Sequence, residues 1–429
     1  MASDPFFTSS AAQGPEMIDS PLMRCAGREL LSLALMDGRN HTLQLFGQYQ
    51  NALEAVNFVV PKISTINPPL WSLGHVGWFQ EWWIARNLQR ARGRHASPEQ
   101  TRLPSIEPDA DSWWNPEVVP HDSRWALALP DVQACRAYLL TSLESTLELL
   151  EKADSDDDAL YFYRLCLFHE DLQSEALVHG AQALGLALEP IWQKVFTPPS
   201  MTLREPLLLP ATRWQLGSAA TEAGFAFDNE QSAHVIQVPE FEIDAQLVTW
   251  AQYVEFVGDG GYDSEEFWQP AGWQWLQRLA TSEGRRGPRY VEQIGAASGA
   301  VIQSRFGQPM RMLGQQPAMH MSWWEADAWC RWAGRRLPTE VEWELAAHNA
   351  ARRGFRWGDA WEWTASTFGP YPGFVPGPWL AGSLASFGTH KVLRGASFAT
   401  RARLKHLKFR NFQLPERDDI FCGFRSCAL

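Results

Sequence analysis

The sequence predicts an α+β protein in which a four-helix bundle precedes a loop-rich domain. Three observations predict this order. Apolar residues recur at helical spacing in several long segments of the first 196 residues, which is the pattern of amphipathic helices. Proline density then rises and the periodicity stops. The remainder is rich in Trp and Gly and has only short candidate strands. We therefore divide the chain into a flexible leader, a bundle, a linker and a loop-rich domain at residues 1–24, 25–196, 197–214 and 215–429.

Four helices are expected in the bundle. The first covers residues 24–59 and ends before Pro61. The second opens at Pro68 and Pro69, because proline is tolerated in the first turn of a helix. Four amphipathic helices with one long connection are typical of a four-helix bundle, in which ligands from facing helices commonly meet in the core. The long connection covers residues 93–130. The third helix covers residues 131–152, and the fourth covers residues 161–185.

The C-terminal domain is expected to be strand-poor. No internal repeat of fixed period is present, which argues against a propeller or a solenoid. Candidate strands lie at residues 234–238 and 240–243. Candidate helices lie at residues 249–257, 323–332 and 340–349.

Composition argues against several classes of protein. The chain of 429 residues has a formal net charge of −12. This charge argues against a general nucleic-acid binder, which relies on Lys and Arg to neutralise phosphates. No signal-peptide pattern is present and no apolar run reaches about 18 residues, so no membrane span is expected. The six Cys residues are scattered without a CxxC pair, which indicates reduced thiols in a cytoplasmic protein.

Two of the expected helices carry candidate metal ligands. His169 and Gln173 are four residues apart and therefore point to one side of the fourth helix, with Glu175 two residues further on. Two such side chains can bind one ion, although a lone helical His is more often hydrogen-bonded in a core or on a surface. His75 lies in an aromatic stripe of the second helix, where a hydrogen bond or a metal must satisfy its ring nitrogens. The residues alone leave both interpretations open.

Four strings follow one another in the C-terminal half, namely MSWWEADAWCRWAGRRLPTEVEWELAA, WGDAWEWTAS, KVLRGASF and CGFRSC. They resemble the formylglycine-generating-enzyme (sulfatase-modifying factor) domain, which has a C-type-lectin-like fold. PPLWSLGHVGWFQEWW and FHEDLQSE in the first half are similar to strings of DinB-like helical bundles. Together they resemble the ergothioneine-type sulfoxide synthases, non-haem iron enzymes that use O2 to join sulfur to the imidazole C2 of hercynine. Selenoneine synthases are a similar branch that accepts a selenosugar.

The resemblance implies an Fe(II) site. The family's first ligand is the His of its LGHxxWF string, which corresponds to His75. The first His of its His-x-x-x-His-x-Glu string corresponds to His169, and Gln173 stands where the second His is expected. An amide oxygen is a weaker donor to iron than imidazole. Either Gln173 is a third ligand, or water fills this position, or iron is bound weakly.

The resemblance also implies residues that act on the substrates. Tyr371 of YPGF corresponds to the family's active-site tyrosine, which would deliver a proton or a hydrogen bond to bound oxygen. The alternative is a turn tyrosine that holds the WEWT string to the core. Asn411, Phe412 and Gln413 stand where thiol-using members carry Asn-Trp-Asp, and Phe412 offers a π face to the trimethylammonium group of hercynine. Leu172 stands where those members often carry a Gln that meets the imidazole.

The chalcogen donor is predicted from charged residues that thiol-using members of the family carry and this chain lacks. The Arg pair that would hold gamma-glutamylcysteine is expected about 36–40 residues after His75, where residues 111–115 are DSWWN. Gln413 also removes a carboxylate. A site lined by Trp113 and Trp114 suits a neutral sugar, because sugars stack on aromatic faces and hydrogen-bond with neutral polar groups.

We therefore expect an Fe(II) enzyme that takes O2, hercynine and a selenosugar, forms a C–Se bond and yields selenoneine through a hercynyl selenoxide. Its active site is expected between the two domains. One alternative is an ergothioneine-type sulfoxide synthase with a thiol donor. A second is a non-catalytic ligand-binding module. The expected protein is a cytoplasmic monomer or weak homodimer that binds neither nucleic acid nor membrane.

Overall fold

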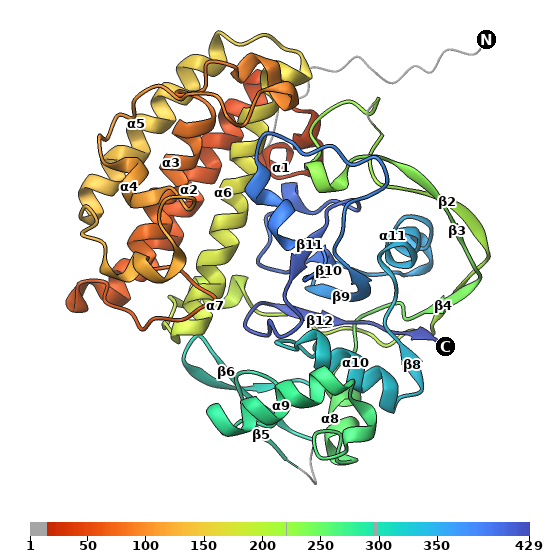
Figure 1. The fold of residues 1–429 in the computed structure, drawn as a ribbon. Coiled ribbons are helices and arrows are strands. Elements are labelled where there is room, and N and C mark those ends of the chain that lie inside the picture. The colour runs from red at the N-terminus through yellow and green to blue at the C-terminus, as the bar shows by residue number, and fades with distance from the viewer. Residues whose placement is uncertain (1–14, 220, 296–298) are drawn as a thin grey trace, which may run out of the picture.

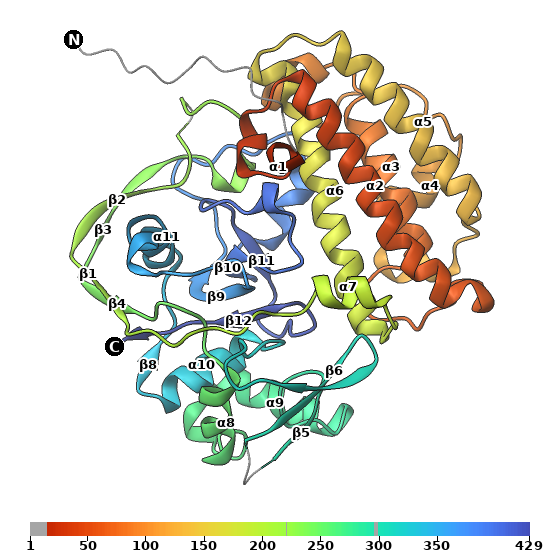
Figure 2. The same ribbon diagram turned by 180° about the vertical axis from the view of Figure 1, so that it is seen from behind.

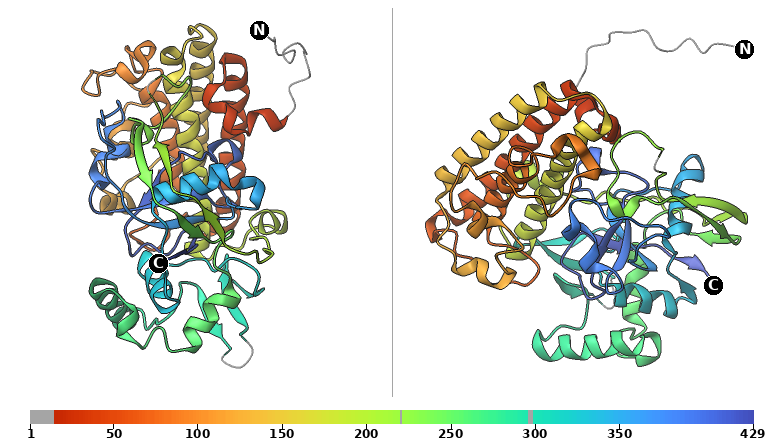
Figure 3. Two further views of the ribbon diagram at one scale, coloured as in Figure 1. Left: turned by 90° about the vertical axis from the view of Figure 1, so that its right-hand side faces the viewer. Right: turned by 45° about the horizontal axis from the view of Figure 1, so that its top comes forward.

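The computed structural model describes residues 15–219, 221–295 and 299–429. A helical bundle and a mixed helix-and-sheet domain lie side by side, and helix α6 (Asp157–Leu184) runs along the boundary between them (Figures 1 and 2). The right-hand view in Figure 3 shows the long helices of the bundle on one side of the molecule and the strands on the other. This arrangement confirms the predicted α+β class.

Four long helices form the bundle, close to the segments predicted as helical. Helices α2 (Arg28–Leu53) and α3 (Pro69–Trp83) each contact both α5 (Val132–Glu151) and α6. The helix α5 begins after Asp131, whose carboxylate accepts the backbone N–H of Ala134, and α6 begins after Asp156 in the same way. Helix α6 ends at Gly185, whose φ of 64° is the left-handed conformation that terminates many helices. The helices of this half in chain order are α1 to α7, at Pro15–Ile18, Arg28–Leu53, Pro69–Trp83, Ala110–Trp114, Val132–Glu151, Asp157–Leu184 and Pro190–Val195.

Two segments expected outside the domains are built into them. Part of the expected leader forms α1 and the 3-10 helix η1 (Pro21–Cys25). Arg24 in η1 is buried and forms an ion pair of 2.5 Å with Glu230 of the C-terminal half. Residues 207–214 of the expected linker contribute β1 (Leu207–Leu209) and most of β2 (Thr212–Leu216). These strands pair with β4 (Phe241–Ile243) and β3 (His234–Val238). Polar composition and proline density did not reveal these partners, because each partner lies far away in the sequence.

The C-terminal half contains short strands in several small sheets. Two sheets have four strands each, in the orders β1-β4-β13-β8 and β11-β10-β9-β12. In the second of these, β9 pairs antiparallel with β10 and parallel with β12. A two-stranded sheet, β2-β3, and a three-stranded sheet, β5-β6-β7, complete the set among the described residues. Strands β1 to β13 span Leu207–Leu209, Thr212–Leu216, His234–Val238, Phe241–Ile243, Val291–Ile294, Val301–Arg305, Gln308–Met312, Arg335–Arg336, Ala360–Thr367, Lys391–Ala396, Asn411–Gln413, Cys422–Phe424 and Cys427–Ala428.

The helices of this half begin where the sequence supplies capping boxes. Thr249, Ser322 and Thr339 each accept the backbone N–H of the residue three positions later, whose Gln or Glu side chain bonds back to the cap. These local signals explain why the three helices predicted here are confirmed. Helices α8 to α11 span Trp250–Gly258, Pro270–Ser282, Trp323–Trp332 and Glu340–Asn349.

Helix α6 joins the two halves through buried polar contacts. Asp171 accepts two hydrogen bonds from the guanidinium of Arg403, at 2.7 and 2.8 Å. One turn later, Glu175 Oε1 accepts from Trp361 Nε1 at 2.9 Å and from two hydroxyl groups of the C-terminal half. The helix is therefore buried on two sides, and its position relative to the C-terminal sheets is set by charge-assisted bonds.

The structure also bears on membrane-spanning helices and on the state of the cysteines. Within the described ranges, no helix is both long and apolar enough to cross a membrane. All six cysteines have free thiols, which agrees with the absence of paired spacings in the sequence.

Candidate metal site between the two domains

Two buried histidines meet where the bundle contacts the C-terminal half. His75 comes from α3 and His169 from α6, and their ring centroids lie 5.3 Å apart at an angle of 67°. The residues are 6% and 3% exposed. Helix packing thus brings together two of the three metal ligands that the resemblance implies.

The orientation of His75 is fixed by its neighbours. Its Nδ1 lies 2.9 Å from the carbonyl oxygen of Trp114, so Nδ1 carries the proton and Nε2 has the lone pair. The indole of Trp71 stacks on the imidazole at 4.7 Å. Burial lowers the pKa of His75 to about 4, so the ring is neutral at physiological pH. A neutral imidazole with one nitrogen held by a carbonyl is the usual state of a metal-ligating histidine.

His169 is held by stacking and is also neutral. The ring of Phe79 lies parallel to it, with centroids 3.5 Å apart. Burial, and then the nearby His75, lower the pKa of His169 well below its usual value. Two neutral imidazoles side by side cost little to bury, whereas two imidazolium ions would repel each other. The pair is therefore prepared to bind a cation.

Gln173 lies next to the two histidines, where the resemblance places a third donor. Its Nε2 lies 3.4 Å from His169 Nε2, so the amide faces the nitrogen that would bind a metal. A half-turn of the terminal amide would present its oxygen to the same place. Glu175 faces away, because its carboxylate is used by Trp361, Ser397 and Thr400. Among the described residues, no group of three His, Cys, Asp or Glu side chains is placed to hold a metal ion.

These donors fit a divalent iron ion. Two neutral imidazoles and one amide are borderline-to-hard neutral ligands of the kind that iron accepts, and they leave further coordination positions for substrates. The set differs from a closed structural zinc site, which has four protein ligands, commonly with Cys.

A cavity of about 480 Å³ opens next to the two histidines. Both halves of the molecule line it. The bundle contributes the histidines, Gln173 and aromatic side chains, and the C-terminal half contributes residues 378–381. The lining residues are His75, Trp78, Phe79, Trp82, Trp83, Pro98, Glu99, Asn115, Pro116, Glu117, His169, Gln173, Pro378, Trp379, Leu380 and Ala381.

The structure places Trp113, Trp114 and Leu172 outside this lining. Trp114 is fully buried and stacks on Tyr138 at 5.0 Å, so its ring belongs to the core and only its carbonyl serves His75. Trp113 is half-buried, and its carbonyl accepts the indole N–H of Trp71 at 2.7 Å. Leu172 packs against the core. Helix α4 turns both indoles into the bundle, and the residues that reach the cavity are the next ones, from Asn115 onward.

The structure also places the predicted C-terminal residues elsewhere. The hydroxyl of Tyr371 donates to Glu340 at 3.3 Å, and the guanidinium of Arg410 lies 3.9 Å from its ring. Burial, and then Glu340, raise the pKa of Tyr371 well above its usual value. This geometry corresponds to the alternative weighed above, a tyrosine with a structural role. It does not bring Tyr371 to the histidines, because Glu340 and Arg410 bind it within the C-terminal core.

Strand β11 carries the other three predicted residues away from the cavity. Phe412 stacks on Phe368, with ring centroids 4.0 Å apart. The side chain of Asn411 accepts the backbone N–H of Phe412, and Gln413 accepts from Arg417 at 3.2 Å. Pairing of β11 with β10 holds all three in the sheet.

The C-terminal residue that does reach the histidines is Trp379. Its indole meets His169 edge-on, with centroids 5.6 Å apart, and meets Phe79 at 5.2 Å. Sequence reasoning missed it because a single Trp among 22 carries no local signal. Its position eight residues after Tyr371, in the same loop region, was the available hint.

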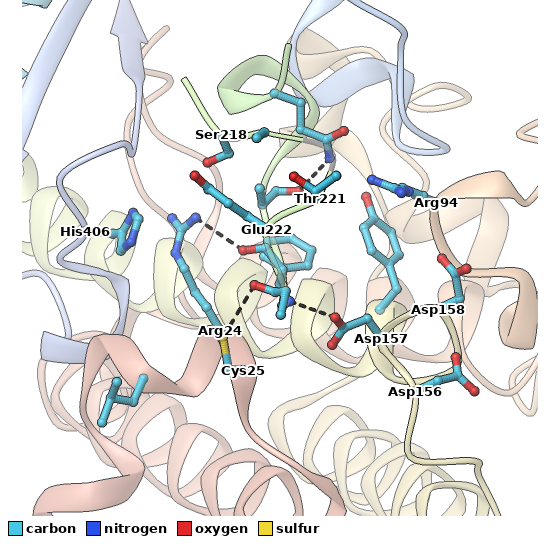
Figure 4. Close-up of a pocket in the computed structure, with 18 of the residues that line it drawn as sticks. Arg24, Cys25, Arg94, Asp156, Asp157, Asp158, Ser218, Thr221, Glu222 and His406 are labelled. Carbon is cyan, nitrogen blue, oxygen red and sulfur yellow. Dashed lines mark hydrogen bonds between the residues drawn. The ribbon is translucent and has the colours of Figure 1, made fainter. Parts of the chain in front are cut away.

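A larger cavity of about 570 Å³ lies elsewhere on the domain boundary (Figure 4). It is lined by η1, the start of α6 and the loop around residues 218–226. Several of its polar groups bond across the boundary between the two halves. Asp157 accepts the backbone N–H of Gly224 at 2.8 Å, Arg24 reaches the carbonyl of Phe225, and Cys25 lies against the carbonyl of Ala223 (Figure 4). We interpret this cavity as a seam that joins the two halves.

Comparison with known proteins identifies the family. Residues 193–359 and 356–428 match the family described as sulfatase-modifying factor enzyme 1-like domain. Hercynine oxygenase from Mycolicibacterium smegmatis is 30% identical to this chain, over 93% of this chain and 98% of that protein. The chain belongs to the hercynine oxygenase family. Hercynine oxygenase from Mycobacterium tuberculosis is also 30% identical, over 84% of this chain and 90% of that protein.

The C-terminal half has a further relative. Formylglycine-generating enzyme from Streptomyces coelicolor is 34% identical over 35% of this chain and 49% of that protein. The predicted resemblance to the sulfatase-modifying factor domain and to the hercynine-oxidising family is thus confirmed. The likeness of the bundle to DinB-like proteins and the choice of selenosugar stay predictions.

Proposed function

We propose that this protein is an Fe(II)- and O2-dependent hercynine oxygenase that joins a selenosugar to the imidazole C2 of hercynine, toward selenoneine. The single observation that carries the proposal is the pair of neutral histidines beside Gln173 at an aromatic cavity between the two halves. Membership of the hercynine oxygenase family supports the reaction class.

His75, His169 and Gln173 would hold the iron, which when bound supplies the O2 chemistry and an open position for a soft chalcogen donor. The protein's own share is positioning. The carbonyl of Trp114 keeps His75 in one tautomer, and the ring of Phe79 keeps His169 in one orientation. Alignment of the reactants in such a cavity lowers the entropic barrier to bond formation.

The charge of the cavity supports a neutral donor. Its described lining includes two carboxylates, Glu99 and Glu117, and neither Lys nor Arg. A dipeptide thiol with two carboxylates would lose charge-assisted hydrogen bonds worth roughly 1.5–3 kcal/mol each. A sugar needs no such partner, and its ring can stack on the indoles. The two carboxylates also complement the trimethylammonium group of hercynine.

The second candidate function is sulfoxide synthesis with a thiol donor, and one observation favours it. Arg102 stacks on Trp82 at 5.2 Å and on Trp83 at 4.7 Å, and both indoles line the cavity. None of its three guanidinium nitrogens has a hydrogen-bond partner among the described residues. A small movement of this side chain would offer a carboxylate anchor to an acidic thiol.

A competition experiment separates the two functions. The protein is incubated with Fe(II), O2 and hercynine together with equal concentrations of a selenosugar and gamma-glutamylcysteine, and the products are identified by mass spectrometry. We expect mainly selenium-bearing product. The Arg102→Gln variant should leave that result unchanged, as should the control Arg331→Gln, which alters an exposed arginine. If the product instead bears mainly sulfur, and this product disappears in Arg102→Gln, the selenium proposal is overturned and sulfoxide synthesis with a thiol donor is favoured.

A further inference from the structure

One short loop carries Trp379 from the C-terminal half to the metal site. Residues 377–383 include the 3-10 helix η8 (Leu380–Gly382), and Trp379 immediately precedes it. The indole meets the rings of His169 and Phe79 edge-on, at 83° and 77°. This loop therefore supplies the wall of the cavity that faces the bundle's ligands.

A single carboxylate ties both ends of this loop. Asp228 Oδ2 accepts the backbone N–H of Gly377 at 3.2 Å, and its Oδ1 accepts the hydroxyl of Ser383 at 2.6 Å. The neighbouring Asn229 donates to the same hydroxyl oxygen at 3.1 Å. Both Asp228 and Asn229 belong to η5 (Asp228–Glu230), about 150 residues away in the sequence. The loop is thus closed by a contact that its own residues do not provide.

Close packing leaves the loop little freedom between these ends. A Cβ atom on Gly382 would lie 2.9 Å from the indole of Trp379, so the backbone here touches the ring. A Cβ on Gly377 would lie 3.3 Å from the Cβ of Asp228. Glycine at these two positions permits the approach that the tie requires.

Asp228 is buried without a cationic partner among the described residues, so its hydrogen bonds to the loop matter for the stability of this region. Asp228 is 8% exposed, and within the described ranges its carboxylate is held by hydrogen bonds and not by an ion pair with Lys, Arg or His. Burial raises the pKa of its carboxyl group. Taking a carboxylate out of water without a cation is expensive, so its hydrogen bonds to the loop must offset much of that cost.

We propose that Asp228 is a positioning residue which, by tying both ends of the 377–383 loop, holds Trp379 as the wall that determines which chalcogen donor fits beside the metal. This inference rests on the proposed function, because it assigns Trp379 to donor selection at the same site. Asp228 itself touches neither metal ligand in the structure and acts through the loop.

A double-mutant comparison tests this coupling. Asp228→Asn replaces an acceptor by a donor at one end of the tie, and Trp379→Ala removes the wall. We expect each to raise KM for the selenosugar by about tenfold, which corresponds to about 1.4 kcal/mol, with kcat changed by less than about threefold. Because both act through Trp379, the double variant should be no worse than Trp379→Ala alone. Effects that multiply would overturn the proposal. Asp263→Asn, an exposed carboxylate far from the loop in sequence, is the matched control.

Hydrogen exchange tests the tie without turnover. The peptide that contains residues 377–383 should exchange at least about tenfold faster in Asp228→Asn than in the wild type and in the Asp263→Asn control. Unchanged exchange would overturn the tie. If Asp228→Asn does not fold, Ser383→Ala removes one bond from the same carboxylate and is expected to act in the same direction. A wild type that does not turn over hercynine would sink the proposed function, while the exchange result would still decide the tie.

Discussion

Two buried polar clusters in this protein are satisfied in opposite ways. In the first, His75 and His169 lie side by side in neutral form, and Gln173 reaches toward them beside a cavity. In the second, Arg410 binds both oxygens of Glu340 at 2.9 and 3.1 Å and covers the ring of Tyr371. The first cluster leaves donor atoms for a ligand, whereas the second uses its charges internally.

The difference shows why a motif and its role need separate arguments. Both clusters lie in strings that resemble the same family, and both are buried. Arg410 also donates to the carbonyls of Asn229 and Gly369, so each nitrogen of its guanidinium has a partner within the protein. A group whose hydrogen bonds are all made within the protein stabilises the fold. A neutral imidazole beside a cavity is available for chemistry. Four predictions test this contrast, from the largest effect to the smallest.

Replacing His169 by Ala should abolish turnover and weaken Fe(II) binding by more than about 100-fold, because one of two imidazole ligands is lost. His75→Ala should behave in the same way. Anaerobic Fe(II) titration and product analysis measure both effects, and circular dichroism checks that the fold persists. His348→Ala, an exposed histidine on α11, serves as control. Full iron binding in His169→Ala would remove this residue from the site.

Replacing Arg410 by Met should cost about 3–5 kcal/mol in the free energy of unfolding, because Glu340 is left as a buried charge without its partner. Urea unfolding measures this loss. Fe(II) affinity of the folded fraction should not change. Arg331→Met, which breaks an exposed pair with Asp327, should cost at most about 1 kcal/mol. A weakened iron site at full stability would instead connect the two clusters.

Replacing Gln173 by His should tighten Fe(II) binding by about tenfold, because imidazole is the stronger donor. The titration that measures His169→Ala also measures this change. Gln193→His, on α7, controls for the added imidazole. An unchanged affinity would place position 173 outside the metal's ligand set, despite its 3.4 Å approach to His169.

Replacing Tyr371 by Phe should have the smallest effect, a loss of about 0.5–1.5 kcal/mol of stability from one hydrogen bond and less than about threefold in kcat. Steady-state rates and urea unfolding test both numbers. A proton donor in the reaction would contribute about 10²–10⁴-fold. A fall in kcat of that size at unchanged stability would restore the role that the family resemblance implied for Tyr371.

The parts of the fold that sequence predicted are those set by local interactions. Helical spacing located α2, α3, α5 and α6, because backbone hydrogen bonds and the apolar face repeat within one segment. The C-terminal helices α8, α10 and α11 begin at Thr or Ser caps, which act within one turn. The extent of the leader and the linker was less predictable, since Arg24 and strand β1 depend on partners more than 30 residues away.

By itself, the sequence determined that His75 and His169 are candidate ligands and that Gln173 departs from the family's string, because residue type and helical spacing are local properties. Only the tertiary structure decided which C-terminal side chain reaches them. Trp379 arrives there through a loop tied to Asp228, while Tyr371, Asn411, Phe412 and Gln413 are held by their own sheet and ion pair. Packing between distant segments sets these positions, and the periodicity of a single segment does not predict such packing.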